Sequence, residues 1–238
     1  MQEEVTTSFE ERLASVRRRI EEAARRAGRE PEAVELLPVT KGHPPALLGR
    51  VAEAGLGRIG ENRVQEAEEK RDILGTDLGL HWHLIGHLQR NKAARAVRLF
   101  EVVESVDSVR LARRLSREVE RAGRPGLPIL IEVNTSGEET KAGFRAPALE
   151  AALTEICRLP GLRVDGLMTM APWTRDEALL RSTFRRTREL LERCAARVEA
   201  FEGRVLSMGM SNDFEIAVEE GSTRVRLGTV LFGERAER

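Results

Sequence analysis

Tyrosine is absent from this 238-residue chain, and cysteine, lysine and long apolar runs are scarce. The two cysteines, Cys157 and Cys194, lack metal-ligand spacing and fall in stretches with a helical pattern, so we interpret both as small core residues. No apolar run approaches the length of a membrane span, and the N-terminus lacks the apolar core of a signal peptide. These absences predict a soluble protein of the cytoplasm, without a membrane partner.

The charged side chains are numerous but balanced. The 39 basic and 39 acidic residues cancel to a net charge of zero. A neutral chain has no general attraction to nucleic acid or to an anionic membrane surface, so we expect neither as a partner. Almost all of the basic residues are arginine, and the lysines are Lys41, Lys70, Lys92 and Lys141. This scarcity leaves few candidates for any chemistry that needs a lysine amine.

Helical and strand-like segments alternate along the chain. Residues 8–27 predict an amphipathic helix, because Ser8 and Glu11 form a capping-box pattern and apolar residues recur at helical spacing up to Gly28. Strand-like apolar runs follow at residues 36–39, 58–60, 82–85, 102–106, 129–133, 164–168, 204–206 and 225–227. Helical segments between them include residues 45–54, 63–73, 109–122, 176–199 and 213–220.

Eight strand-like runs with intervening helices predict an α/β fold, a closed parallel (β/α)8 barrel of the TIM type. An open doubly wound sheet is the alternative, but the nucleotide-binding fingerprint expected after its first strand is missing. Because no linker or repeat interrupts the pattern, we expect residues 1–238 to form a single barrel domain. Residues 1–30 would supply an additional N-terminal helix that packs on the barrel.

Lys41 ends the first strand-like run, and functional groups of such barrels gather at the carboxyl ends of the strands. Desolvation at the end of a buried strand favours the neutral amine, which is a nucleophile toward an aldehyde. From its position alone, an equally good interpretation is a lysine that only extends its amine to solvent at the rim.

The turns after the last two runs combine glycines with hydroxyl groups. Residues 207–213 lead into a helix, and Gly228 and Thr229 follow the final run. Barrels often bind phosphate through the loops after strands seven and eight. Ser211 in isolation is more simply a helix N-cap, but the second turn beside it favours a phosphate site. A lysine on the first strand beside such turns is the geometry that pyridoxal 5′-phosphate (PLP) requires.

Seven motifs occur in order at residues 39–41, 60–66, 82–92, 133–143, 166–170, 206–211 and 221–229. They resemble the motifs of the pyridoxal phosphate homeostasis proteins, a PLP-binding family that shares the fold of the alanine racemase N-terminal domain. The resemblance implies PLP as the cofactor. The cofactor-binding residues that it implies are Lys41, Asn62, Met210, Ser211, Arg226, Gly228 and Thr229.

The resemblance also implies a role for most of these residues. Lys41 would hold PLP as a Schiff base, and Asn62 would line the pocket near the lysine. Ser211 and the turn at 228–229 would bind the phosphate, and Arg226 would face the pyridine nitrogen. The chain departs from the family pattern at residues 42–43 and 212. At 42–43 the family usually has bulkier residues, and an aspartate is frequent where this chain has Asn212.

Arg226 and the missing tyrosine bear on catalysis. A guanidinium facing the ring nitrogen disfavours its protonation and so weakens the ring as an electron sink, which argues against transamination. Without the resemblance, Arg226 would be interpreted as a strand arginine in a surface ion pair. Alanine racemases add a second domain and take their opposite-face base from its tyrosine, but this chain has no tyrosine and no room for that domain.

One-base racemisation by Lys41, or by a substitute base such as His83, is the alternative function. We expect His83 and His87 on a loop at the barrel top and His81 just before a strand. No carboxylate or cysteine pattern makes these histidines a metal set, so we expect no metal. A class I aldolase without PLP is disfavoured because its lysine typically lies on a later strand.

The resemblance implies a carrier without catalytic residues, not an enzyme. It would buffer intracellular PLP, a form of vitamin B6, and supply it to apo-forms of PLP-dependent enzymes, as a monomer. A second PLP on Lys92 or Lys141 is left open. A protein-interaction module has no specific support, because the charge-rich segment 176–199 is most simply a solvated helix face.

Overall fold

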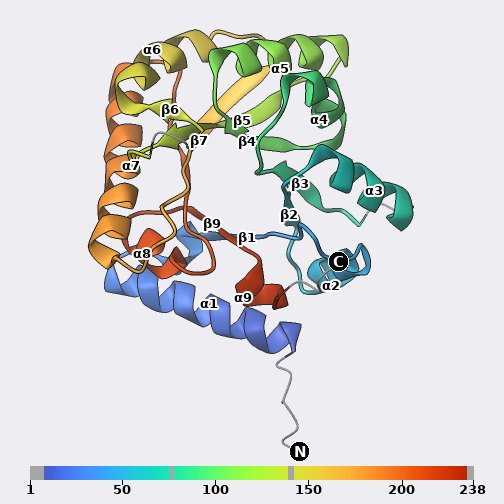
Figure 1. The fold of residues 1–238 in the computed structure, drawn as a ribbon, viewed down its shortest axis with the longest axis vertical. Helices are drawn as coiled ribbons and strands as arrows, with labels where there is room; N and C mark the ends of the chain where they lie inside the picture. Colours follow the sequence, from blue (N-terminus) through green and yellow to red (C-terminus); the bar gives the residue numbers. More distant parts are fainter. Residues whose placement is uncertain (1–7, 76–77, 139–141, 235–238) are drawn as a thin grey trace, which may run out of the picture.

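A ring of parallel strands surrounded by helices forms the body of the protein (Figure 1). The computed structural model describes residues 8–75, 78–138 and 142–234. Its strands are β1 (Glu35–Pro38), β2 (Arg58–Glu61), β3 (His81–Leu84), β4 (Val102–Val106), β5 (Leu127–Asn134), β6 (Phe144–Arg145), β7 (Leu162–Met168), β8 (Val205–Ser207) and β9 (Arg224–Leu227). Its α-helices are α1 (Phe9–Arg26), α2 (Ala46–Glu53), α3 (Val64–Leu74), α4 (Ala93–Leu99), α5 (Val109–Arg121), α6 (Ala146–Ile156), α7 (Glu177–Arg197), α8 (Phe214–Glu219) and α9 (Thr229–Phe232).

The strand order around the ring is β1, β9, β8, β7, β5, β4, β3 and β2, and every pairing is parallel. A bridge between Val39 and Gly60 joins β1 to β2 and completes the ring. In the part of the chain that the structure describes, the expected barrel of eight parallel strands is therefore confirmed. The short β6 is additional and pairs with the end of β5.

The first helix lies outside the ring, against α8 and α9 (Figure 1). Its expected capping box is confirmed, because the Ser8 hydroxyl accepts a hydrogen bond from the Glu11 amide and the Glu11 carboxylate accepts one from the Ser8 amide. Leu13, Val16 and Ile20 are buried on one face of this helix. The amphipathic pattern thus attaches α1 to the outer layer of helices.

Side chains alternate between the outer and inner faces of the barrel strands. Val225 and Leu227 of β9 pack in the large hydrophobic core between the strands and the helices. Successive side chains of a strand point to opposite faces, so Arg224 and Arg226 face the barrel interior. Both arginines are buried there. The interior of this barrel is consequently polar and charged near β9.

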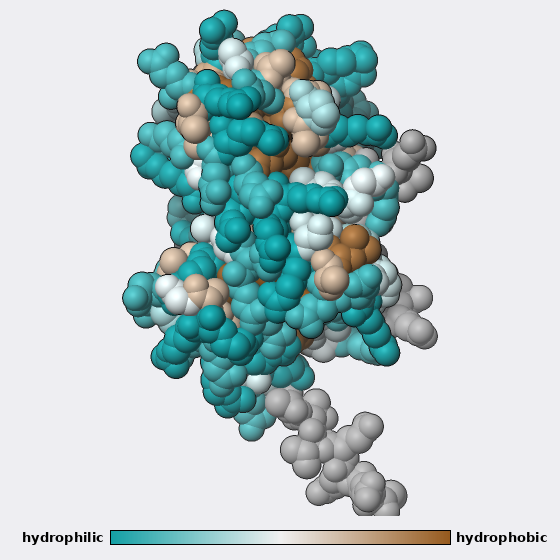
Figure 2. Space-filling model, turned by 90° about the vertical axis from the view of Figure 1, so that its left-hand side faces the viewer, coloured by the Kyte–Doolittle hydropathy of each residue, from teal (hydrophilic) through white to brown (hydrophobic). Residues whose placement is uncertain are grey.

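The face formed by α7 is mostly hydrophilic, as expected for residues 176–199 (Figure 2). Arg181 forms ion pairs with Glu177 and Glu219, and Arg185 forms one with Glu220. The opposite side of the helix is buried against the core. Among the described residues, no helix is long and apolar enough to cross a membrane.

Three helices, α4, α6 and α9, lie outside the helical segments identified from the sequence. The sequence of α6, APALEAALTEI, is rich in alanine and has little contrast between its faces, so its helical period is weak. Cys194 of α7 is buried, as expected. Cys157 caps the C-terminus of α6 and packs against the core, but it is only half-buried.

Candidate cofactor site

Lys41 lies in a tight turn at the C-terminal end of β1. The His43 amide donates a hydrogen bond to the Thr40 carbonyl across 3.1 Å and closes the turn around Lys41 and Gly42. Gly42 has a φ of +74°, in the left-handed region that favours glycine, which gives a structural reason for glycine at this departure from the family pattern.

The side chain of Lys41 belongs to the inner face of the barrel. Leu37 and Val39 form a small apolar cluster with Ile85 of the neighbouring loop, separate from the outer core. The alternation of side chains along the strand continues from these residues to Lys41. Lys41 is half-buried, so its amine lies at the mouth of the barrel and not in its core.

The turn also contacts the element that follows β9, the strand next to β1. The ring of His43 packs edge-on against the ring of Phe232, with the ring centres 5.3 Å apart. Phe232 ends α9, the short helix that follows β9. His43, where the chain departs from the family pattern, therefore contacts α9, the helix that begins at the predicted phosphate turn.

The turns that follow β8 and β9 meet at the same mouth. The Ser211 hydroxyl accepts a hydrogen bond from the amide of Val230 across 3.3 Å. The helix α8 has Asp213 as its N-cap, so the interpretation of Ser211 as a helix N-cap is wrong. Ser211 instead joins the loop after β8 to α9. A side chain at position 228 would bring a Cβ to 3.2 Å from the Val39 carbonyl, so glycine allows this turn to approach β1 closely.

Several main-chain donors at these turns are free to bind an anion. Within the described ranges, the amides of Ser211, Asn212 and Thr229 donate no hydrogen bond. The Met210 amide is occupied, because it donates to the Asp213 carboxylate across 2.6 Å. Backbone amides of this kind, next to a hydroxyl, form an anion-binding concavity. Asn212, which stands where the family frequently has an aspartate, is exposed.

Arg226 lies below this mouth, in the barrel interior. It is opposite Leu37 in the pairing of β9 with β1 and is 4% exposed. Its guanidinium donates to the Ser207 hydroxyl and to the Thr169 carbonyl, each across 2.8 Å. The interpretation of Arg226 as a surface ion pair is therefore wrong. Burial lowers the pKa of Arg226, and the Glu104 carboxylate opposes that effect.

Glu104 anchors the polar network behind Arg226. Its carboxylate accepts hydrogen bonds from Ser207 across 2.6 Å and from Arg224 across 2.9 Å, and His83 Nδ1 lies 2.7 Å from it. Burial alone would raise the pKa of Glu104, but Arg224 and His83 together lower it to about 2. An ionised carboxylate thus balances the buried arginines and holds Ser207 in place for Arg226.

The expectation that His83 lies on a loop at the barrel top is wrong. His83 is inside β3, is 2% exposed and is bonded to Glu104. His87 does lie on the loop after β3, where its Nδ1 is 3.1 Å from the Asp107 carboxylate. His81 is the exposed first residue of β3. In the described part of the chain, no group of three or more histidine, cysteine or acidic residues could hold a metal ion.

Asn62 follows β2 and is half-buried. A side chain at position 86 would place a Cβ 2.4 Å from the Asn62 side-chain oxygen, so Gly86 leaves the room that Asn62 occupies. Lys92 is half-buried in a single 3-10 turn between β3 and α4, whereas Lys141 lies outside the described residues. Of the predicted residues, the mouth of the barrel brings together Lys41, Asn62, Met210, Ser211, Gly228 and Thr229, with Arg226 deeper.

A second set of buried polar residues behind the Lys41 turn was not identified from the sequence. The Lys70 amine donates to the Thr40 carbonyl across 2.7 Å and to the Glu61 carboxylate across 2.6 Å. The Thr40 hydroxyl also donates to Glu61. Burial raises the pKa of Glu61 despite the opposing charge of Lys70. The available signals were the rarity of lysine and the position of Glu61 beside Asn62.

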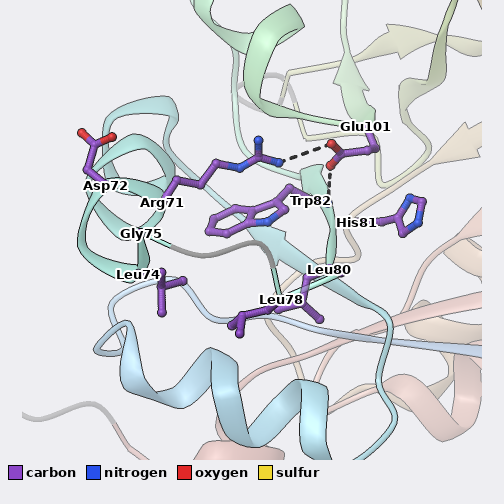
Figure 3. Close-up of a pocket in the computed structure, with 10 residues that line it drawn as sticks. Arg71, Asp72, Leu74, Gly75, Leu78, Leu80, His81, Trp82 and Glu101 are labelled. Atoms are coloured by element: carbon purple, nitrogen blue, oxygen red, sulfur yellow. Dashed lines mark hydrogen bonds and ion pairs between the residues drawn. The ribbon is translucent and has the colours of Figure 1, made fainter.

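A cleft of about 660 Å³ lies at the other end of the barrel, between the end of α3 and the start of β3 (Figure 3). Arg71 stacks over the Trp82 ring there and pairs with Glu101, which also accepts a hydrogen bond from the Trp82 amide (Figure 3). These contacts link α3 to the N-terminal ends of the strands. Functional groups of such barrels lie at the opposite, C-terminal face, so we assign this cleft no role in cofactor binding.

The groups at the mouth fit the chemical groups of PLP. A half-buried amine matches an aldehyde, a hydroxyl with free amides matches a phosphate, and a buried guanidinium matches an unprotonated ring nitrogen. The fold and this site define a (β/α)8 barrel of the alanine racemase N-terminal type. In agreement, the family described as alanine racemase, N-terminal domain, matches residues 12–236.

The chain is also similar to named proteins along almost its whole length. It is 43% identical over 229 residues to the pyridoxal phosphate homeostasis protein of Pseudomonas aeruginosa, covering 96% of each chain. It is 41% identical over 227 residues to that of Aquifex aeolicus, covering 94% of this chain and 97% of the other. It is 37% identical to PipY of Synechococcus elongatus, solved with PLP bound, with a TM-score of 0.84 and coverage of 95% and 100%. The chain therefore belongs to the family of pyridoxal phosphate homeostasis proteins.

Proposed function

We propose that this chain binds PLP at the barrel mouth and takes part in intracellular PLP homeostasis. One observation carries the proposal: the Lys41 turn and the Ser211 turn lie at the same mouth, with the Arg226 guanidinium below them. The relatives named pyridoxal phosphate homeostasis protein and the PipY structure with PLP bound support it.

Lys41 holds the cofactor covalently in this proposal. When bound, PLP would supply an aldehyde, and the Lys41 amine would hold it as a Schiff base. The turn of residues 40–43 keeps the lysine at the mouth, where the residue is half-buried. Asn62 and Met210, both half-buried, line the space beside it.

The remaining residues bind and orient the other ends of the molecule. The Ser211 hydroxyl, the amides at 211–212 and the turn at Gly228 and Thr229 would bind the phosphate. Arg226 would face the ring nitrogen and, as a cation, would disfavour its protonation. Because Ser207 holds the guanidinium, Arg226 cannot easily move away from that position. An unprotonated ring stabilises a carbanion weakly, which suits storage better than catalysis.

We propose that the protein is a carrier that passes PLP to apo-forms of PLP-dependent enzymes, acting in the cytoplasm as a monomer. The lack of tyrosine and the commitment of His83 to Glu104 support a site without an opposite-face base. One-base racemisation by Lys41 is the alternative. No observed contact favours it, and a chiral assay of L-alanine with the PLP-loaded protein separates the two functions.

The test is to add PLP, reduce with borohydride and map the modified peptide by mass spectrometry. We expect a pyridoxyl group on Lys41 that is lost in Lys41→Ala and retained in Lys92→Ala, the matched control. Labelling of the Lys41→Ala variant to the wild-type extent, or no labelling of the wild type, would overturn the assignment.

A further inference from the structure

The turn that carries Lys41 is held from outside the barrel by two side chains of α3. The Lys70 amine donates to the carbonyl of Thr40, the residue before Lys41. The Glu66 carboxylate accepts a hydrogen bond from the amide of Gly42, the residue after Lys41. Both main-chain neighbours of Lys41 are therefore tied to the same helix.

Lys70 also joins these two attachments to each other. Its amine lies 2.8 Å from Glu66 and 2.6 Å from Glu61, in addition to its bond to Thr40. An ammonium group has three N–H donors, and these three acceptors use all of them. Lys70 is 3% exposed and Glu61 is fully buried. The amine is thus held in one position, with two carboxylates around it.

Charge compensation of Glu61 does not account for all of these contacts. An ion pair between Lys70 and Glu61 would balance the buried charge without a bond to the Thr40 carbonyl, and it would not require Glu66 to accept from Gly42. Both additional bonds, to the Thr40 carbonyl and from the Gly42 amide, attach to the turn of residues 40–42. They restrict the main chain on both sides of Lys41. When rigid elements hold a reactive group in place, less conformational entropy is lost as the ligand binds.

We propose that Lys70, together with Glu66, is a positioning residue that fixes the main chain of Lys41 for PLP binding and release. This inference rests on the proposed function of Lys41. Lys70 does not touch the cofactor; it acts through Thr40, and Glu66 acts through Gly42. The strength with which α3 holds the turn sets how tightly PLP is retained.

The first test is Lys70→Met, which keeps most of the side-chain length and removes the amine. Lys92→Met is the matched control, because Lys92 lies in a different turn of the barrel. We expect Lys70→Met to weaken PLP binding about tenfold, the effect of losing a charged hydrogen bond. In the protein without PLP, we expect faster hydrogen exchange of the Gly42 and His43 amides. Lys92→Met should change neither measurement.

A second pair of variants addresses the case in which Lys70→Met does not fold. Glu66 is more exposed than Lys70, so its replacement disturbs the core less. Glu66→Ala removes the acceptor for the Gly42 amide and should weaken PLP binding about fivefold. Glu66→Gln keeps an acceptor oxygen and should bind PLP within about twofold of the wild type. A purely electrostatic role would make Glu66→Gln as weak as Glu66→Ala.

The outcomes separate this inference from the proposed function. If borohydride traps PLP on Lys41 in the wild type, but Lys70→Met and Glu66→Ala bind PLP and exchange the Gly42 amide like the wild type, the positioning role is overturned and the PLP site stands. If Lys41 is not trapped in the wild type, the proposed function fails first. Equal PLP affinities of Glu66→Gln and Glu66→Ala would also overturn the inference.

Discussion

The guanidinium of Arg226 donates a hydrogen bond to the hydroxyl of Ser207 across 2.8 Å inside the barrel. Ser207 in turn donates to Glu104 across 2.6 Å, and Glu104 accepts from Arg224. The position of Arg226 beneath the mouth thus depends on a carboxylate at the centre of the barrel. Disturbing that carboxylate should affect stability and cofactor binding together.

Replacing Glu104 with glutamine should lower the free energy of unfolding at pH 7 by about 3 kcal/mol, because Arg224 and Arg226 lose a buried counter-charge. The pKa of Glu104 is lowered from 4.5 to about 2 in the folded protein. Its stabilisation is therefore complete above pH 4.5 and is lost as the pH falls toward 2. We expect the difference between wild type and Glu104→Gln to shrink over that range. Urea unfolding of both proteins at about pH 7, 4 and 3 measures this difference in the free energy of unfolding.

Glu53 provides the control, because it is an exposed glutamate of α2. Glu53→Gln should change the free energy of unfolding by less than about 0.5 kcal/mol at every pH. A constant difference between wild type and Glu104→Gln from neutral to acid pH would contradict the ionised state of Glu104.

Replacing Arg226 with glutamine should weaken PLP binding about tenfold, because the amide cannot reproduce the fork that reaches Ser207 and the Thr169 carbonyl. Borohydride should still trap PLP on Lys41. A changed absorption spectrum of the bound cofactor is expected, because the cation that disfavours ring protonation is gone. Arg204→Gln, at an exposed ion pair, is the control. An unchanged spectrum and affinity would remove Arg226 from the site.

Replacing Ser211 with alanine should weaken PLP binding about tenfold through the loss of a hydrogen bond to a charged phosphate. Pyridoxal, which has the same ring and aldehyde but no phosphate, should bind the variant and the wild type equally. Parallel titrations with the two ligands measure the effect. An equal loss of affinity for both ligands would assign Ser211 a purely structural role in joining its loop to Val230.

Replacing Gly209 with alanine should lower the free energy of unfolding by about 2 kcal/mol. Gly209 has a φ of +96°, and an added Cβ would lie 2.6 Å from the Ala217 Cβ. Because this glycine precedes the Ser211 turn, PLP binding should weaken as well. Gly57→Ala is the control, since its Cβ would meet nothing within 4 Å. Equal unfolding midpoints of the two variants in urea would contradict the steric assignment.

The predictable parts of the fold and site follow local patterns. The run at 36–39 predicted a strand, and its end placed Lys41 at the barrel mouth, because side-chain period and strand direction are local properties. Ser211 was identified by its pairing with a second glycine-hydroxyl turn, and the meeting of the two turns is confirmed by the bond to Val230. Whether these residues bind PLP stays a prediction.

Other features depended on contacts between distant segments. From the residues alone, Arg226 resembled a surface residue. The alternating sequence pattern of a strand is the same whether its polar side chains face solvent or the interior of a barrel. His83 was misplaced on a loop for a related reason, since its partner Glu104 belongs to the next strand. Lys70 was overlooked because its bond to Thr40 spans 30 residues and requires α3 to lie beside the turn that follows β1.

The sequence by itself determined the eight barrel strands, the family, the lysine at the end of β1 and the glycines that the turns of the site require. These features depend on local spacing and backbone conformation. Only the tertiary structure decided which charges meet: Arg224 with Glu104, and Lys70 with Glu61 and Thr40. The physical reason is that a buried charge is stable only beside its counter-charge, and closure of the barrel brings those partners together.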